Sequence, residues 1–228
     1  MRVLTPSDRY VPWIHDLPSG WVVNPLKYWV DINCEALPES TDGGYEFRYI
    51  DISCVTTTGQ IYDPELLTFD TAPTRARRIV RKGDTIVSTV RTYLKAIAFI
   101  DDDSSNLVCS TGFAVLRPYG SILPKFLFYW TRSSYFVDEV CARSVGVGYP
   151  AINALEIGSL PIPILPQERQ AKMVKYLDRR LESVDSLIAI GSLLVTSSSS
   201  NGGLITEYRD SLITAVMSGK IDVRGEVV

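Results

Sequence analysis

The side chains best suited to chemistry with a partner molecule are the cations crowded between residues 72 and 95. Seven Lys and Arg side chains stand there against Asp84 alone, which gives a local net charge of +6 in 24 residues, whereas the whole chain carries −3. Cations this close repel one another on a bare surface but are stabilised beside phosphates, where each contact releases counterions. We therefore expect phosphate contacts from Arg75, Arg77, Arg78 and Lys82.

Two segments combine cations with hydroxyl and aromatic side chains. The basic segment ends in STVRTYLK (88–95), and a glycine-punctuated stretch reads RSVGVGYP (143–150). Arginine can bind guanine through two hydrogen bonds, and tyrosine can bond to phosphate or stack. The side chains we expect at base edges or in a DNA groove are Arg91, Tyr93, Lys95, Arg143, Ser144 and Tyr149. An ordinary charged sheet face and a simple glycine turn are the alternative interpretations of the two segments.

The sequence patterns of common enzymes and cofactor sites are missing. There is no G-x-x-x-x-G-K-[ST] phosphate loop, no G-x-G-x-x-G after a strand and no G-x-S-x-G nucleophile elbow. His15 is the only histidine and the four cysteines form no C-x-x-C pair, which argues against a structural zinc site. Asp84 with Lys95 is the nearest approach to a nuclease carboxylate and lysine. We expect no catalytic residues, no metal and no cofactor.

The composition is that of a soluble globular protein. The chain has 228 residues, of which 46% are hydrophobic and 21% charged. No apolar run reaches the roughly 18 residues that a membrane helix needs. The first residues, MRVLTPSDRYVPW, lack the apolar core of a signal peptide. A cytoplasmic protein without membrane contact is therefore expected.

The elements before residue 160 predict an α+β domain with a curved, mostly antiparallel sheet. Alternating and β-branched residues predict a strand over residues 46–55. Residues 79–80 and 85–90 predict a hairpin around a tight turn at Gly83. Residues 124–133 begin with proline, which is typical of the first position of a helix. We expect residues 1–160 to form one globular domain.

The elements after residue 160 predict a helical arm over residues 161–228. Pro161, Pro163 and Pro166 predict a stiff extended strap, since none of them fits inside a helix. A helical period then runs from about Gln167 to Leu194 and returns at Ile205 after a Ser/Gly-rich, flexible break at 196–203. The apolar positions of the two helices are Met173, Leu177, Leu181, Val184, Leu187, Tyr208, Leu212 and Val216. We favour pairing of this stripe with another chain over packing on residues 1–160.

The order of several segments resembles the specificity subunit of type I restriction–modification systems. These segments are STVRTYLKAIAFI (88–100), STGFAVLRP (110–118), FLFYWTRSSYFVDEV (126–140), ARSVGVGYPAIN (142–153), LPIPILPQERQ (160–170) and SLITAVMSGKIDV (211–223). The resemblance covers the chain from about Trp21 to Val223. It implies a target-recognition domain that reads one half of a split double-stranded DNA sequence. It also implies a helical region that acts as a spacer and docks methyltransferase (modification) subunits, which in turn join the restriction subunit. In that family the catalytic residues belong to the partner subunits.

The chain departs from the family pattern in its size. Family members carry two recognition domains and two helical regions, whereas this chain has one of each. A half-sized subunit would have to dimerise through its helices, and the dimer would read an interrupted palindrome. The competing hypothesis is an assembly or decoy module that binds the modification subunit without reading DNA. The basic segment at 72–95 favours DNA reading, while the apolar helices fit both hypotheses.

Overall fold

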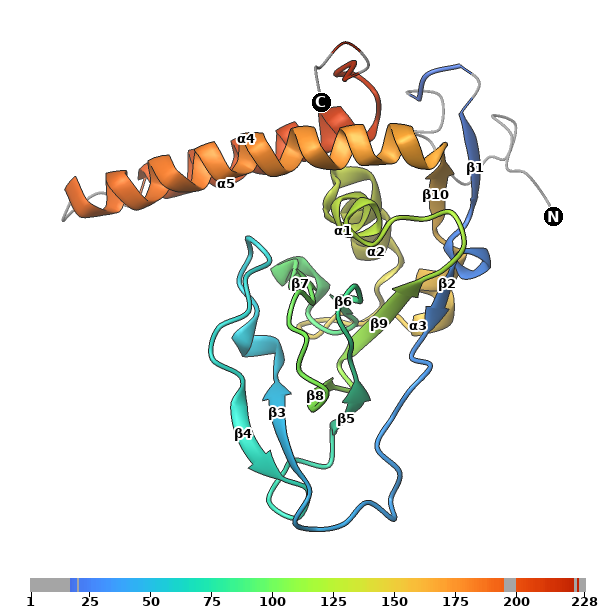
Figure 1. The fold of residues 1–228 in the computed structure, drawn as a ribbon, viewed down its shortest axis with the longest axis vertical. Helices are drawn as coiled ribbons and strands as arrows, with labels where there is room; N and C mark the ends of the chain where they lie inside the picture. The colour runs from blue at the N-terminus through green and yellow to red at the C-terminus, as the bar shows by residue number, and fades with distance from the viewer. Residues whose placement is uncertain (1–16, 20, 195–199, 224, 226–228) are drawn as a thin grey trace.

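The molecule is a body of strands and short helices with two long helices lying side by side across one end (Figure 1). The computed structural model describes residues 17–19, 21–194, 200–223 and 225. The long helices extend past the body on one side (Figure 1). The predicted α+β class and the long C-terminal helix are confirmed.

The strands form two four-stranded sheets and one two-stranded ribbon. The antiparallel sheet contains, in spatial order, β2 (Val30–Ile32), β9 (Phe113–Pro118), β6 (Thr85–Ser88) and β7 (Ile97–Phe99). The mixed sheet contains β4 (Glu65–Thr68), β3 (Glu46–Ile50), β8 (Leu107–Ser110) and β5 (Ala76–Ile79), with β3 and β8 parallel. The ribbon pairs β1 (Val22–Pro25) with β10 (Pro161–Ile164).

The helices connect and cover these strands. The short 3-10 helices are η2 (Leu26–Tyr28), η3 (Ile52–Cys54) and η4 (Thr92–Leu94). The α-helices are α1 (Pro124–Arg132), α2 (Ser134–Arg143), α3 (Ala154–Ser159), α4 (Gln167–Leu194) and α5 (Ser200–Met217). Helix α1 begins with the proline that predicted it, and α4 spans the predicted residues.

The prediction of a hairpin over residues 79–90 is wrong. Ile79 ends β5 in the mixed sheet, whereas Thr85 begins β6 and pairs with Leu116 in the antiparallel sheet. The turn with Gly83, whose φ is +92°, therefore carries the chain from one sheet to the other. Alternation along a strand predicts which side chains are buried, but it does not identify the neighbouring strand.

The strand predicted over residues 46–55 ends at Ile50. Asp51 follows it, and one of its carboxylate oxygens accepts a hydrogen bond from the backbone N–H of Ser53 at 3.3 Å. Aspartate is a preferred residue at the start of a helix because it satisfies such an otherwise unpaired N–H. The result is η3, which turns the chain out of the sheet directly after β3.

The proline strap is extended as predicted, but it belongs to the ribbon. Val22 faces Ile164 and Pro25 faces Pro161 across the β1–β10 pair. A two-stranded ribbon tolerates prolines because each strand has a free edge. The strap is therefore held against the start of the chain, and α4 leaves from the end of this ribbon.

The hydrophobic core continues across residue 160. Side chains of α1, such as Phe126 and Trp130, pack in one cluster with side chains of α4 and α5. Of the predicted apolar stripe, the buried members are Met173, Leu177, Leu181, Val184, Leu212 and Val216. Tyr208 is exposed, and the side chain of Leu187 lies outside the described part. The described stripe thus follows the alternative in which the helices fold back on the domain.

The second long helix begins earlier than the sequence predicts. Helix α5 starts at Ser200, so the Ser/Gly-rich residues 200–203 belong to it. Residues 196–199 of the predicted break, and His15, lie outside the described residues. The helix ends at Met217, and Gly219 follows with a φ of +74°, its N–H donating to the carbonyl of Val216 at 2.9 Å.

Candidate nucleic-acid interface

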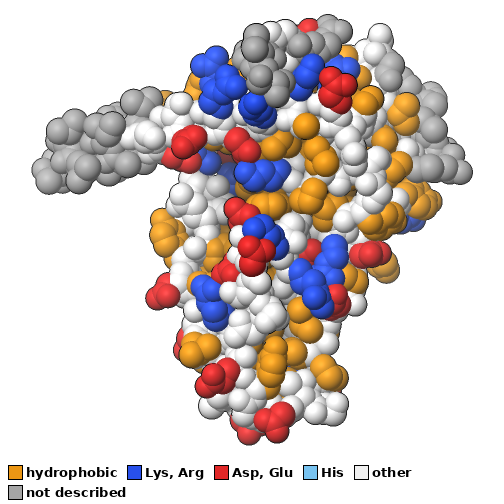
Figure 2. All heavy atoms as spheres, in the orientation of Figure 1, with side chains coloured by type: hydrophobic (Ala, Val, Ile, Leu, Met, Phe, Trp, Pro, Cys, Tyr) orange, Lys and Arg blue, Asp and Glu red, His pale blue; other side chains and the backbone are white. Residues whose placement is uncertain are grey.

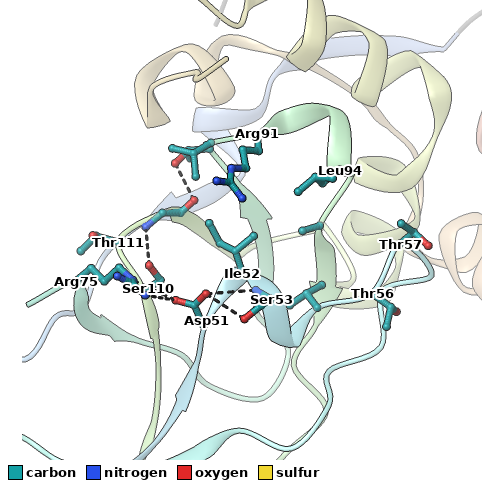
Figure 3. A pocket seen from close by; sticks show the side chains of 15 residues that line it. Asp51, Ile52, Ser53, Thr56, Thr57, Arg75, Arg91, Leu94, Ser110 and Thr111 are labelled. Carbon is teal, nitrogen blue, oxygen red and sulfur yellow. Dashed lines mark hydrogen bonds and ion pairs between the residues drawn. The ribbon is translucent and has the colours of Figure 1, made fainter. Parts of the chain in front are cut away.

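An open cleft of about 960 Å³ lies where η3, the start of η4 and the β8–β9 turn come together (Figure 3). Apolar side chains such as Ile52 and Leu94 line part of it (Figure 3). The remaining lining is rich in hydroxyl groups, which belong to Ser53, Thr56, Thr57, Thr89, Ser110 and Thr111. Such a surface offers many hydrogen-bond donors and acceptors around two cations, Arg75 and Arg91.

Arg75 is held on the cleft wall by an ion pair with Asp51 (Figure 3). The guanidinium lies 3.0 Å from the carboxylate, and its Nε donates to the Tyr49 hydroxyl at 3.1 Å. Tyr49 in turn donates to Asp51 at 2.9 Å. Burial alone would raise the pKa of Asp51, but the hydrogen bonds from Tyr49, Ser53 and Arg75 outweigh it and lower that pKa below its usual value. Asp51 is therefore an ionised anchor for an exposed arginine.

Arg91 stands where the chain turns sharply at the edge of the same cleft. Arg91 and Lys95 flank η4 with φ values of +48° and +51°, in the left-handed region that few non-glycine residues adopt. Between them Thr92 is buried while Tyr93 is exposed. The turn thereby presents the side chains of Arg91, Tyr93 and Lys95 to solvent.

The two segments that the sequence marked separately lie against each other. The Arg91 guanidinium stacks on the Tyr149 ring at 4.7 Å, and the Arg91 N–H donates to the carbonyl of Pro150 at 2.8 Å. The hydroxyl groups of Thr92 and Ser144 are 2.9 Å apart. We call residues 89–95 and 143–151 together the loop pair. The loop pair contains all six predicted groove residues, and Arg143 lies at its base, at the end of α2.

Several predicted DNA contacts are already paired with carboxylates. Arg143 binds Glu139 at 2.9 Å and the Ser159 hydroxyl at 3.1 Å. Lys95 lies 3.5 Å from Asp210 of α5, and Lys82 lies 2.8 Å from Asp103. Ion pairs at exposed positions are weak, so a phosphate can replace the carboxylate at small cost.

Arg77 and Arg78 are half-buried, and their guanidinium groups contact other residues of the chain. Arg77 lies over the Phe69 ring at 4.4 Å. Arg78 donates to the side chain of Asn33 at 2.6 Å and to the carbonyl of Phe113. Burial lowers the pKa of Arg78. We therefore do not retain Arg78 as a phosphate contact, because its guanidinium links the two sheets.

The visible face in Figure 2 carries no continuous basic patch. Lys and Arg side chains stand in small groups next to Asp and Glu, and the end farthest from α4 is acidic (Figure 2). Among the exposed cations of the predicted set, Arg91 is the one without a carboxylate partner within the described residues. Its guanidinium keeps its hydrogen-bonding edges available while the ring of Tyr149 fixes its plane.

Sequence reasoning missed the hydroxyl-rich lining and the role of Asp51. The signal was present in two short runs, Thr56 to Gly59 and Ser110 to Gly112, which join hydroxyl side chains to a glycine. Each run lies at a turn, and η3 and the β8–β9 turn bring them to the same cleft. The runs are far apart in sequence, so only the tertiary fold reveals that they are neighbours.

The structure separates the residues that a nuclease would need together. Asp84 accepts two hydrogen bonds from Arg117, each at 2.8 Å, whereas Lys95 is directed to Asp210. Within the described residues, no group of three or more His, Cys, Asp or Glu side chains is arranged to hold a metal ion. In the same part of the chain, no helix is long and apolar enough to cross a membrane.

Comparison with known proteins identifies a family. A family model described as the type I restriction modification DNA specificity domain matches residues 18–189. The type I restriction enzyme HindI specificity subunit of Haemophilus influenzae is 32% identical over 116 residues, which are 48% of this chain and 25% of that protein. The crystal structure of the HsdS subunit from Thermoanaerobacter tengcongensis matches with 31% identity and a TM-score of 0.68.

A second structural match comes from work on complex assembly and conformational transition of the type I R-M system. It has 31% identity and a TM-score of 0.70. Both structural matches cover 78% of this chain and 46% of the matched chain, so this chain spans about half of those proteins. From the matched domain and the shared fold, we conclude that the chain belongs to the family of type I restriction–modification DNA specificity subunits.

Proposed function

We propose that this chain recognises one half of a split double-stranded DNA sequence through the loop pair. The observation that carries the proposal is Arg91, an exposed cation stacked on Tyr149 and without a carboxylate partner in the described residues. Arginine held in a fixed plane is suited to two hydrogen bonds with the O6 and N7 atoms of guanine. Because the ring restricts the side chain before DNA binds, less conformational entropy is lost on binding.

Four cations that are paired with carboxylates suit contacts with the DNA backbone. Arg75, Lys82, Lys95 and Arg143 are each held by a carboxylate on or near the surface. These ion pairs orient the cations in the free protein. A DNA phosphate can then replace the carboxylate, because an exposed ion pair is weak and each phosphate contact releases counterions. We assign phosphate contacts to them, and base contacts to Arg91, Tyr93 and Tyr149, with Ser144 holding the loop pair together.

Assembly with other subunits is the second part of the proposal. Leu204 and Tyr208 stand one helical turn apart on α5 and are 65% and 57% exposed. We infer that this face, together with the outer part of α4, pairs with a second copy of the chain and docks the modification subunit. The chain itself carries out neither methylation nor cleavage.

The test is selection of DNA by the purified chain, alone and mixed with its modification subunit. Light scattering would give the stoichiometry, and a randomised duplex library would give the preferred sequence. We expect a complex with two copies of this chain that selects an interrupted palindrome. A complex that forms normally but selects no sequence would contradict DNA recognition, and would favour the assembly module.

A further inference from the structure

The loop Ser144–Tyr149 ends in an apolar tip that the fold does not use. Val145, Val147 and Tyr149 are 78%, 104% and 68% exposed. Burial therefore gives Val147 no part in stabilising the folded chain. Exposed apolar side chains that gather at one place mark contact surfaces.

The base of this loop is held firmly, although its tip is exposed. Val145 and Ala151 exchange two backbone hydrogen bonds of 2.9 and 3.0 Å. At the entrance, the Ser144 hydroxyl donates to the carbonyl of Val140 at 2.7 Å. The loop is thus a narrow projection, closed at its base by one bridge and anchored to α2 through Ser144 and to the Arg91 segment through Pro150.

Two glycines give the tip its shape. Gly146 and Gly148 have φ values of +126° and +85°. A Cβ atom at residue 146 would lie 3.0 Å from the carbonyl oxygen of Tyr149, closer than ordinary packing allows. The glycines close the loop tightly and leave Val147 between them at its apex, two residues before the Tyr149 ring on which Arg91 stacks.

We propose that Val147 reads a thymine by contact with its 5-methyl group in the major groove. This inference rests on the proposed function. The major groove is about 12 Å wide, enough to admit a helix or a two-stranded ribbon, and the thymine methyl is the apolar group that distinguishes bases there. Val147 offers no side-chain hydrogen bond, so a methyl group is the base feature that it can recognise. Arg91, which stacks on Tyr149 of the same loop, supplies the polar contact that would fix the loop in the groove.

The experiment uses the complex of the chain with its modification subunit and the DNA site that this complex selects. Each thymine of the site is replaced in turn by uracil, which removes only the 5-methyl group. We expect one replacement to weaken the wild-type complex about fourfold, the value for losing one buried methyl group. Val147→Ala should bind the thymine site about fourfold more weakly and should not distinguish thymine from uracil at that position.

The control is Leu66→Ala, which removes another exposed aliphatic side chain (62%), from β4. It should retain the wild-type preference for thymine, and both variants should melt at the wild-type temperature. Unchanged uracil discrimination in Val147→Ala would overturn the inference while sequence selection, and with it the proposed function, still stands. A Val147→Ala protein that loses affinity for the modification subunit instead would show that the tip is a protein contact.

Discussion

Arg75 and Arg91 line the same cleft, but different neighbours hold them. Arg75 is fixed by the Asp51 carboxylate, and Arg91 by the ring of Tyr149. An ion pair leaves a guanidinium with part of its hydrogen-bonding capacity occupied, whereas a stacked ring occupies only its face. The two arginines therefore suit different tasks, backbone contact for Arg75 and base reading for Arg91.

Replacing Arg75 should weaken binding to all DNA sequences alike. For Arg75→Gln we expect the slope of log K against log salt to decrease by about 1, because one phosphate contact and its released counterion are lost. The measurement is fluorescence anisotropy across a salt series on selected and random duplexes. Arg48→Gln is the matched control, since Arg48 also pairs with a carboxylate, Asp102, outside the cleft. Equal slopes for the two variants would remove Arg75 from the interface.

Asp51 should contribute stability that is lost in acid. Its folded-state pKa is lowered, so its contribution is present above the unfolded carboxyl pKa of about 4 and disappears as pH falls through the folded value. We expect Asp51→Asn to melt below wild type near neutral pH, and the difference to shrink below about pH 4. Thermal melts across this range test it. A difference independent of pH would mean that ionised Asp51 does not stabilise the fold.

At the residue scale, the sequence predicted which types of side chain matter better than where they lie. Arg91, Tyr93 and Tyr149 are exposed and close together, as a shared interface requires. Arg78 stands in the same basic segment, yet it is half-buried at Asn33. Charge density along the chain cannot distinguish these cases, because strand β5 turns alternate side chains to opposite faces.

At the element scale, Gln170 attaches the arm to the domain. This fully buried side chain accepts from the N–H of Leu123 at 2.9 Å, and donates to the carbonyls of Ser121 and Leu165 at 2.8 Å each. It thereby ties the first turn of α4 to the start of α1. One buried side chain thus serves three backbone groups.

Gln170→Ala should therefore destabilise the protein by about 2–3 kcal/mol, the cost of leaving buried polar groups unpaired. Chemical denaturation monitored by tryptophan fluorescence would measure it. Gln167→Ala is the matched control from the same turn, because Gln167 makes only one long bond, of 3.4 Å, to Gly120. Its effect should stay within about 0.5 kcal/mol. Similar losses for both variants would contradict the anchoring role of Gln170.

The bounds of α4 were predictable and the sheet neighbours were not. The bounds of α4 follow from a helical period that is local in sequence. The pairing of β3 with β8 joins residues such as Arg48 and Leu107, which are far apart in the chain. Likewise, nothing local in residues 79–90 shows that β5 and β6 belong to different sheets. The cleft is lined by segments that these pairings bring together, so its lining could not be predicted from the sequence.

At the scale of the whole molecule, most of the described apolar stripe is used within the chain. Leu177 and Val216, for example, are fully buried in the core shared with α1. Among the described side chains of α5, Leu204 and Tyr208 are large apolar groups that stay exposed, and we propose their face as the one that meets a partner. The chain also spans 46% of the structurally matched subunits.

Placing a charge on that face should weaken association without unfolding the chain. For Tyr208→Lys we expect the dissociation constant for self-association, measured by analytical ultracentrifugation, to rise at least about tenfold. Tyr62→Lys is the control, since Tyr62 is similarly exposed (61%) but lies before β4. Association unchanged by Tyr208→Lys would place the interface elsewhere.

The most direct test of the account compares the DNA sequences selected by wild-type and Arg91→Gln complexes from one randomised library. We predict that Arg91→Gln still assembles and binds DNA, but loses its preference at one base pair of each half-site, at a cost of about 1–3 kcal/mol there. The identical sequence preference at every position, or an equal loss on selected and random DNA, would contradict base reading by the loop pair.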